Sequence, residues 1–256
     1  MSMVLVETRA LVKRFGSFTA VDGISFSVNS GEVVGFLGPN GAGKSTTMRL
    51  IAGFLEPTSG SALIAGHDSQ RDPVPARQRL GYLPEGAPLY PDMTVASFLE
   101  FVAGMRGLNA ARTRERLAEV VESIELAEVW NRRIDALSKG FKRRVGIAQA
   151  LVHDPDVLIL DEPTDGLDPN QKHEVRELIR SIAANKAIII STHILEEVEA
   201  VCTRAIIIAR GKMLADATPD ELIARTPANG PDGKPRSGSL RLEDYFREIT
   251  RQPVEA

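Results

Sequence analysis

The segment Gly38-Pro39-Asn40-Gly41-Ala42-Gly43-Lys44-Ser45-Thr46 satisfies the pattern G-x-x-x-x-G-K-[ST]. An apolar run, Val33–Leu37, precedes it, and apolar residues three and four apart follow it as far as Phe54. The pattern therefore predicts a strand, a glycine-rich loop and a helix, in that order. Glycines let successive backbone N–H groups turn inward toward phosphates, and the helix adds the positive end of its dipole. We expect Lys44 to reach the β- and γ-phosphates of a nucleotide, and Ser45 to bind Mg²⁺.

A second segment, the acidic pair Asp161-Glu162, directly follows the apolar run Val157–Leu160. A central strand at this run would place Asp161 beside the glycine-rich loop, where it can hold Mg²⁺ through water. Glu162 would then orient and polarise the attacking water. Two adjacent acids after a strand usually belong to a solvated loop, but the phosphate-binding pattern upstream favours the catalytic interpretation.

Strand-length apolar runs alternate with helical patterns along the rest of the chain. Short strands separated by turn residues are expected within residues 2–36. Further strands are expected at Ser61–Ile64, Leu80–Leu83, Val157–Leu160, Ala187–Ile190 and Ala205–Ala209. Helical periodicity covers residues 94–151, and a helix is expected at Gln171–Ala184. This order predicts an α/β fold, with a mostly parallel sheet flanked by helices, an N-terminal antiparallel β subdomain and a helical subdomain insertion.

Composition separates one large domain from a short C-terminal tail. We expect a nucleotide-binding domain over residues 2–226, with its helical subdomain at about 86–152. Residues 227–239 are rich in Gly, Pro, Asn and Asp, which predicts a flexible linker. A short helical tail over residues 240–256 is expected to follow, with an amphipathic helix at Leu242–Thr250.

Charge and hydropathy narrow the class of protein. The net charge of −3 gives no general attraction to nucleic acid or anionic lipid. The one cysteine, Cys202, excludes an internal disulfide and lies in an apolar stretch, so we expect a buried, inert thiol. No apolar run approaches the roughly 18 to 20 residues that span a bilayer, and the N-terminus lacks a signal-peptide core. We therefore expect a cytosolic protein whose membrane role, if any, comes through a partner.

A third segment, Leu137-Ser138-Lys139-Gly140-Phe141, precedes a helical run and carries the most specific resemblance. It lies at the place of the LSGGQ signature, and residues 4–222 resemble the ATPase subunits of ABC transporters. The resemblance implies a P-loop NTPase with an ABC-type core, in which two subunits pair head to tail. Each signature, here Ser138, Lys139 and Gly140, would then cap the ATP held by the opposite P-loop. The expected ligands are ATP and Mg²⁺.

Three further positions match motifs of this family. Pro163-Thr164-Asp165-Gly166-Leu167-Asp168 resembles the D-loop, so the resemblance places Asp168 at the dimer interface. His193 matches the switch histidine, which contacts the γ-phosphate and links it to the catalytic glutamate. Phe15 matches the aromatic residue that stacks on adenine. By itself Phe15 would more often be a core residue, and a lone histidine at a strand end would more often be structural.

The chain departs from the family pattern at two motifs. The Q-loop position holds Glu85 instead of Gln, which can still ligate Mg²⁺ through oxygen but adds a negative charge. The signature has Lys139 for Gly and Phe141 for Gln. Both departures, and the ending Leu242–Thr250, resemble the subgroup that drives type-2 exporters, including drug-efflux, gliding-motility-type and copper-linked systems.

The leading hypothesis is an ATP-hydrolysing subunit of an ABC exporter, peripheral on the cytoplasmic face of the cell membrane. Its expected partners are a transmembrane permease subunit and a second copy of itself or a related ATPase. The alternative is a soluble ABC-type ATPase that acts on DNA or ribosomes. Nucleic-acid binding is not expected, because the arginines that cluster in the helical segment suit a salt-bridged surface. They are Arg112, Arg114, Arg116, Arg132 and Arg133. The transported substrate is not encoded in this chain.

Overall fold

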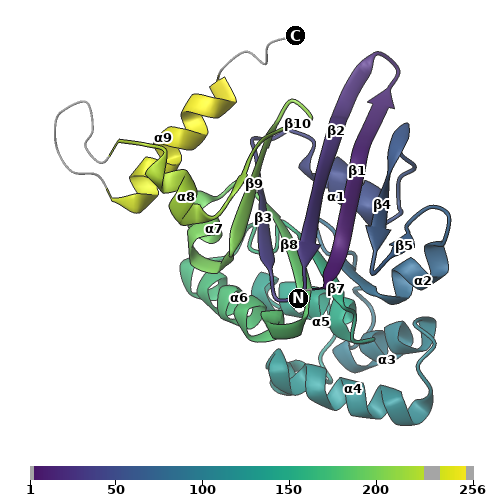
Figure 1. Ribbon diagram of the computed structural model, residues 1–256. Coiled ribbons are helices and arrows are strands. Elements are labelled where there is room, and N and C mark those ends of the chain that lie inside the picture. The colour runs from purple at the N-terminus through teal and green to yellow at the C-terminus, as the bar shows by residue number, and fades with distance from the viewer. Residues whose placement is uncertain (1–2, 228–236, 252–256) are drawn as a thin grey trace.

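The computed structural model describes residues 3–227 and 237–251, which fold around a six-stranded sheet (Figure 1). Its strand order is β10-β9-β3-β8-β7-β6, and all neighbours are parallel except the antiparallel pair β9 and β10. The strands are β3 (Val33–Leu37), β6 (Leu80–Leu83), β7 (Val157–Asp161), β8 (Ala187–Thr192), β9 (Arg204–Ala209) and β10 (Lys212–Ala217). The predicted α/β class with a mostly parallel sheet is confirmed.

The central strands are apolar on both faces because both faces are covered. Leu158 and Leu160 of β7 pack into a core shared with the helical segment, whereas Val157 and Ile159 pack against the N-terminal part of the chain. This alternation follows from the two-residue period of a strand. A parallel sheet buried in this way appears in sequence as a continuous apolar run, as β7 and β8 do.

The second sheet is antiparallel, with the order β2-β1-β4-β5 (Figure 1). Its strands are β1 (Val4–Phe15), β2 (Phe18–Asn29), β4 (Ser59–Ile64) and β5 (His67–Asp68). The predicted antiparallel subdomain is confirmed, although β1, with 12 residues, is much longer than the short strands expected within residues 2–36. Irregularities of register in β1 interrupt the alternation of apolar residues, which explains the underestimate.

Helices pack around the parallel sheet and against one another. They are α1 (Lys44–Ile51), α2 (Pro73–Gln78), α3 (Val95–Met105), α4 (Ala110–Ser123), α5 (Lys139–Leu151), α6 (Pro169–Ile182), α7 (Leu195–Val201), α8 (Pro219–Ala224) and α9 (Gly238–Arg251). The helical insertion comprises α3 to α5, and α3 and α4 lie at the bottom of Figure 1. Thr94, Asn109 and Ser138 each accept a backbone N–H bond and so start these three helices.

Several elements differ from the sequence-based expectation. The helix predicted to reach Phe54 ends at Ile51, because Gly53 adopts a positive φ of 70°. The helix predicted at Gln171–Ala184 begins earlier, at Pro169, because Asp168 caps it. The pattern missed elements that are short or lack clear periodicity, namely α2, α7, α8, β5 and β10.

The C-terminal helix α9 packs on the edge of the core. Leu242 is fully buried with Leu222 of α8, Val198 of α7 and Ile207 of β9. The helix begins at Gly238, earlier than the predicted Leu242. Most of the predicted linker, residues 228–236, and the end of the predicted tail, residues 252–256, lie outside the described residues.

The close packing of α5 on β6 predicts a large stability effect at Gly81. A Cβ at Gly81 would lie 2.2 Å from the Ala150 carbonyl oxygen and 2.8 Å from Leu158 Cδ1. We expect Gly81→Ala to lower the free energy of unfolding by about 1–3 kcal/mol, measured by urea denaturation. The matched control is Gly104→Ala in α3, where a Cβ meets nothing within 4 Å and the change should stabilise by about 0.4–1 kcal/mol. Equal effects of the two substitutions would contradict this packing.

Candidate functional site

Three loops meet at the carboxyl edge of the parallel sheet. The glycine-rich loop follows β3, the acidic pair Asp161-Glu162 ends β7, and His193 follows β8, which lies between β3 and β7. The register pairs Leu37 with Thr192 and Asp161 with Ser191, so the three strand ends are level. Binding sites in open α/β sheets form at this edge, outside the carboxyl ends of the strands.

The glycine-rich loop is held tightly by its surroundings. A Cβ on Gly43, whose φ is 104°, would lie 2.4 Å from the Ala20 carbonyl oxygen, and a Cβ on Gly38 would lie 2.5 Å from the Ile208 carbonyl oxygen. Only glycine fits at these two positions. The loop leads directly into α1, whose first residue is Lys44. The geometry supplies a tightly held glycine loop that leads into a helix start, as an anion cradle requires.

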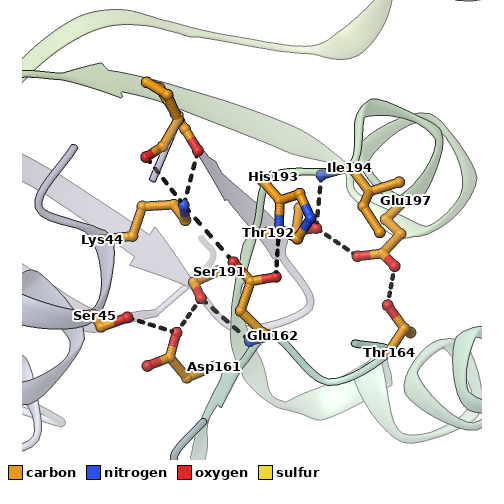
Figure 2. A network of polar contacts seen from close by, with 12 residues as sticks. Lys44, Ser45, Asp161, Glu162, Thr164, Ser191, Thr192, His193, Ile194 and Glu197 are labelled. Carbon is orange, nitrogen blue, oxygen red and sulfur yellow. Dashed lines mark hydrogen bonds and ion pairs between the residues drawn. The ribbon is translucent and has the colours of Figure 1, made fainter. Parts of the chain in front are cut away.

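Lys44 is buried within this loop (Figure 2). Its ammonium donates to the carbonyl oxygens of Gly38 at 2.8 Å and Pro39 at 3.3 Å. A third contact joins Lys44 Nζ to Glu162 Oε1 at 3.7 Å. The sequence-predicted loop lysine and the second acid of the pair are therefore brought together.

Asp161 is fully buried, and its two carboxylate oxygens have different surroundings (Figure 2). Oδ1 accepts hydrogen bonds from Ser45 Oγ, at 3.3 Å, and from Ser191 Oγ. Oδ2 is buried and has no hydrogen-bond partner among the described residues. A buried carboxylate oxygen without a donor, beside a serine hydroxyl, fits a bound divalent cation or its water ligand.

Glu162 has a strained backbone, and its carboxylate contacts the Lys44 ammonium and the His193 ring. Its φ of 50° is uncommon for a residue with a side chain. Its Oε2 lies 2.9 Å from His193 Nδ1, while its Oε1 faces Lys44. The Glu162 N–H donates to the Ser191 carbonyl oxygen at 3.1 Å, which holds the first residue after β7 against β8. Four residues predicted from sequence, Lys44, Asp161, Glu162 and His193, thus form one connected cluster with Ser45.

The remaining residues of the predicted nucleotide site lie around this cluster. Asn40 and Gly41 are exposed at the crest of the loop, Ala42 is buried, and Thr46 is half-buried in the first turn of α1. Phe15, at the end of β1, is 50% exposed, with Lys13 Nζ 5.2 Å from its ring centre. The exposed face of this ring is accessible to a planar ligand.

The predicted signature residues lie apart from this cluster, at the start of α5. Ser138 caps the helix and accepts the Phe141 N–H at 3.3 Å, and Lys139 is exposed. Gly140 is buried and packs closely against α6. A Cβ at this position would lie 2.9 Å from the Gln171 side chain. Asp168 is exposed and caps α6 by accepting the Gln171 N–H at 3.0 Å.

Glu85 lies exposed in the turn after β6. Its negative charge acts on the nearby Arg143 and on Tyr82. Burial, followed by the charge of Asp161, raises the pKa of Tyr82 to about 12. No hydrogen bond from Glu85 to the cluster of Lys44 is present among the described residues, so metal binding by Glu85 stays a prediction.

Sequence reasoning missed the polar residues that support this site. Ser191 donates to Asp161, and a second buried group, Thr164, Thr192 and Glu197, lies beside Glu162 and His193 (Figure 2). The available signal was the Ser-Thr pair at the end of β8. Glu197, four residues after His193, belongs to α7, which the pattern did not predict. Cys202, predicted to be buried, is half-buried. The desolvation of its thiol raises the pKa to about 12, which is consistent with the predicted inert thiol.

The site has a glycine-rich loop between a strand, β3, and a helix. It also has a carboxylate at the end of a buried strand, β7, which is two strands from β3 in the sheet. These features define a P-loop nucleoside triphosphatase. The family model described as "ABC transporter" matches residues 21–165, more than half of the 256-residue chain. The chain belongs to the ABC transporter family, and this membership supports ATPase activity.

Relatives and solved structures agree with this family. The chain is 40% identical over 223 residues to the probable multidrug ABC transporter ATP-binding protein YbhF of Escherichia coli, covering 87% of this chain and 38% of that protein. It is also 40% identical over 223 residues to the Nod factor export ATP-binding protein I of Ralstonia nicotianae, covering 87% of this chain and 70% of that protein. The chain thus spans well under half of the first relative.

Two solved structures share the fold. One, titled as the ATP binding subunit of an ABC transporter, has a TM-score of 0.82 at 31% identity, covering 96% of this chain and all of that chain. The other is cbiO1 from Clostridium perfringens, described as part of the ABC transporter complex cbiONQ. It has a TM-score of 0.78 at 29% identity and covers 87% of this chain and 91% of that chain.

Proposed function

We propose that this chain is the ATP-hydrolysing subunit of an ABC exporter, and that it drives a separate transmembrane subunit. The observation that carries the proposal is the placement of Glu162 between Lys44 and His193, beside the Ser45–Asp161 contact (Figure 2). The names of the relatives, a multidrug transporter protein and a Nod factor export protein, support transport out of the cell.

In this proposal the loop 38–46 and Lys44 bind the phosphates of ATP, and Phe15 stacks on adenine. Ser45 and Asp161 would hold Mg²⁺, which supplies positive charge against the phosphates when bound. Glu162 accepts a hydrogen bond from the attacking water and polarises it toward the γ-phosphorus. His193, held by Glu162 at 2.9 Å, senses the γ-phosphate. Positioning and charge neutralisation then supply most of the rate.

We infer that two copies pair head to tail around two ATP molecules. Ser138 and Lys139 are exposed at the start of α5, where backbone N–H groups can meet the γ-phosphate of the opposite subunit. Asp168 is exposed beside them at the start of α6, as a residue of the dimer interface must be.

An exposed apolar surface supports a membrane-protein partner. Tyr90 and Phe101 are in edge-to-face contact, and Met105, one turn further along α3, is 72% exposed. Phe54 is also exposed and is linked to the end of α3, because Arg106 donates to the Arg77 carbonyl oxygen, and the Arg77 guanidinium lies over the Phe54 ring. Exposed apolar patches of this kind mark protein interfaces.

The occupant we propose is a cytoplasmic helix of the permease, which places this chain on the inner face of the membrane. Within residues 3–227 and 237–251, no helix is long and apolar enough to cross a bilayer. Three of the five arginines that cluster in the helical segment form ion pairs with acidic neighbours. Arg112 pairs with Glu115, Arg116 with Glu119, and Arg133 with Asp92 and Asp135. This pairing favours a solvated surface over a nucleic-acid interface.

The test is affinity purification of this chain from detergent-solubilised native membranes, followed by mass spectrometry. We expect a stoichiometric polytopic membrane protein to co-purify with the wild-type chain. Met105→Glu should lower its recovery by about tenfold, because a charge in an apolar contact costs at least 1–3 kcal/mol, while ATP hydrolysis by the free chain stays unchanged. The matched control is Val4→Glu, at an exposed apolar residue of β1. Recovery of only soluble partners would instead favour the non-transport ATPase.

A further inference from the structure

We propose that Glu197 is a positioning residue for hydrolysis, because its carboxylate ties Thr164 to Thr192 beside the Glu162–His193 contact (Figure 2). Thr164 is two residues after Glu162, and Thr192 directly precedes His193. The inference rests on the roles proposed above for Glu162 and His193.

The hydrogen-bonded link from Thr164 through the Glu197 carboxylate to Thr192, the tie, is buried, and each of its hydrogen bonds has a definite donor and acceptor. Glu197, in the first turn of α7, is 4% exposed, and both threonines are buried. Thr164 Oγ1 donates to Glu197 Oε1, and Thr192 Oγ1 donates to Glu197 Oε2 at 2.6 Å. The Ile194 N–H donates to Thr192 Oγ1 at 3.0 Å, which directs the Thr192 proton to the carboxylate. Each carboxylate oxygen therefore has its own hydroxyl donor.

A carboxylate in this place is costly unless its hydrogen bonds are made. Burial raises the pKa of Glu197, and the Thr192 hydrogen bond and the positive charges of Arg176 and Lys172 oppose that shift. Removing one hydroxyl would leave a buried carboxylate oxygen without a donor. The tie therefore resists separation of the two segments that it joins.

Both joined segments lead directly to the proposed catalytic groups. Between Glu162 and Thr164 stands Pro163, whose ring fixes its φ, and the Asp165 N–H donates to the Glu162 carbonyl oxygen at 3.2 Å. A shift of Thr164 is therefore transmitted to Glu162. On the other side, His193 is 43% exposed and lies between two residues, Thr192 and Ile194, that the tie holds. The tie thus sets the separation of the two backbones from which Glu162 and His193 reach each other.

The experiment measures steady-state ATP hydrolysis, melting temperature and the ¹⁵N shifts of the His193 ring. We expect Thr164→Val, which removes the hydroxyl but keeps the shape, to lower kcat by about tenfold with KM for ATP within about twofold. The His193 ¹⁵N shifts should move toward those of His193 in Glu162→Gln. Thr164→Ser keeps a donor and should restore kcat to within about twofold of wild type.

Thr8→Val is the matched control, because Thr8 is equally buried, in β1, and its hydroxyl bonds the Phe26 backbone. It should lower the melting temperature as Thr164→Val does and leave kcat and the His193 shifts unchanged. Should Thr164→Val fail to fold, Glu197→Gln carries the same expectation, since its carboxamide keeps one acceptor oxygen for two hydroxyl donors.

Unchanged kcat and His193 shifts in a folded Thr164→Val protein would overturn the inference. Two further variants separate this outcome from failure of the proposed function. If Glu162→Gln and His193→Ala retain wild-type turnover, the proposed roles fail. If both lose turnover while Thr164→Val keeps it, only the positioning role of Glu197 fails.

Discussion

Glu162→Gln is expected to lower kcat for ATP hydrolysis by about 100-fold to 10,000-fold while ATP affinity stays within about twofold of wild type. The carboxamide keeps the volume of the carboxylate and can still bond the His193 ring. It has no negative charge, so it polarises water poorly and loses its ion pair with Lys44, now 3.7 Å away. Phosphate release measures kcat, and a nucleotide-fluorescence titration measures the dissociation constant.

Glu196→Gln is the matched control for this substitution. Glu196 is exposed in the first turn of α7, near the site in sequence but on the solvent side. It should keep wild-type kcat and affinity. If Glu162→Gln hydrolyses ATP at the wild-type rate, Glu162 does not act on the attacking water. If it loses affinity as strongly as turnover, the residue acts in binding instead.

The local part of this site was predictable because each group belongs to a short segment. Lys44 and Ser45 follow from one contiguous pattern, and Asp161 and Glu162 follow from an apolar run that ends in two acids. Strand order was not predictable in this way. Asp161 lies beside the loop as the pattern predicts, and Ser45 donates to it. The pattern did not show that β8 lies between β3 and β7 and contributes Ser191 to bond Asp161.

The buried polar residues that support the site could not be predicted, for a different physical reason. Thr164, Thr192 and Glu197 are polar residues in buried positions, and a sequence gives no sign that a polar residue will find buried partners. The helix that carries Glu197 is also too short to show a clear period. The packing of α9 was similarly invisible, because the periodicity of an amphipathic helix indicates one apolar face but not which surface covers it.

Lys44→Ala is expected to act on binding rather than on turnover alone. The substitution removes a charged donor to the phosphates, and charged hydrogen bonds contribute about 1.5–3 kcal/mol, so affinity for ATP should fall by about 10-fold to 100-fold. It also leaves the carbonyl oxygens of Gly38 and Pro39 without the donor that bonds them now. The dissociation constant from a nucleotide-fluorescence titration checks the result. Unchanged affinity would contradict the phosphate cradle.

The control for Lys44→Ala is Lys212→Ala, at a half-exposed lysine that pairs with Asp22 across 3.7 Å. An exposed ion pair contributes about 0–1 kcal/mol, so affinity should stay within about twofold. The two site variants are not expected to be additive, because Lys44 also faces Glu162. Once Lys44 is absent, the Glu162 carboxylate lacks its cationic neighbour and repels the phosphates, so Glu162→Gln should raise ATP affinity in the Lys44→Ala background although it leaves affinity within about twofold in the wild-type chain. Such coupling would identify the lysine and the glutamate as parts of one charge arrangement around the γ-phosphate.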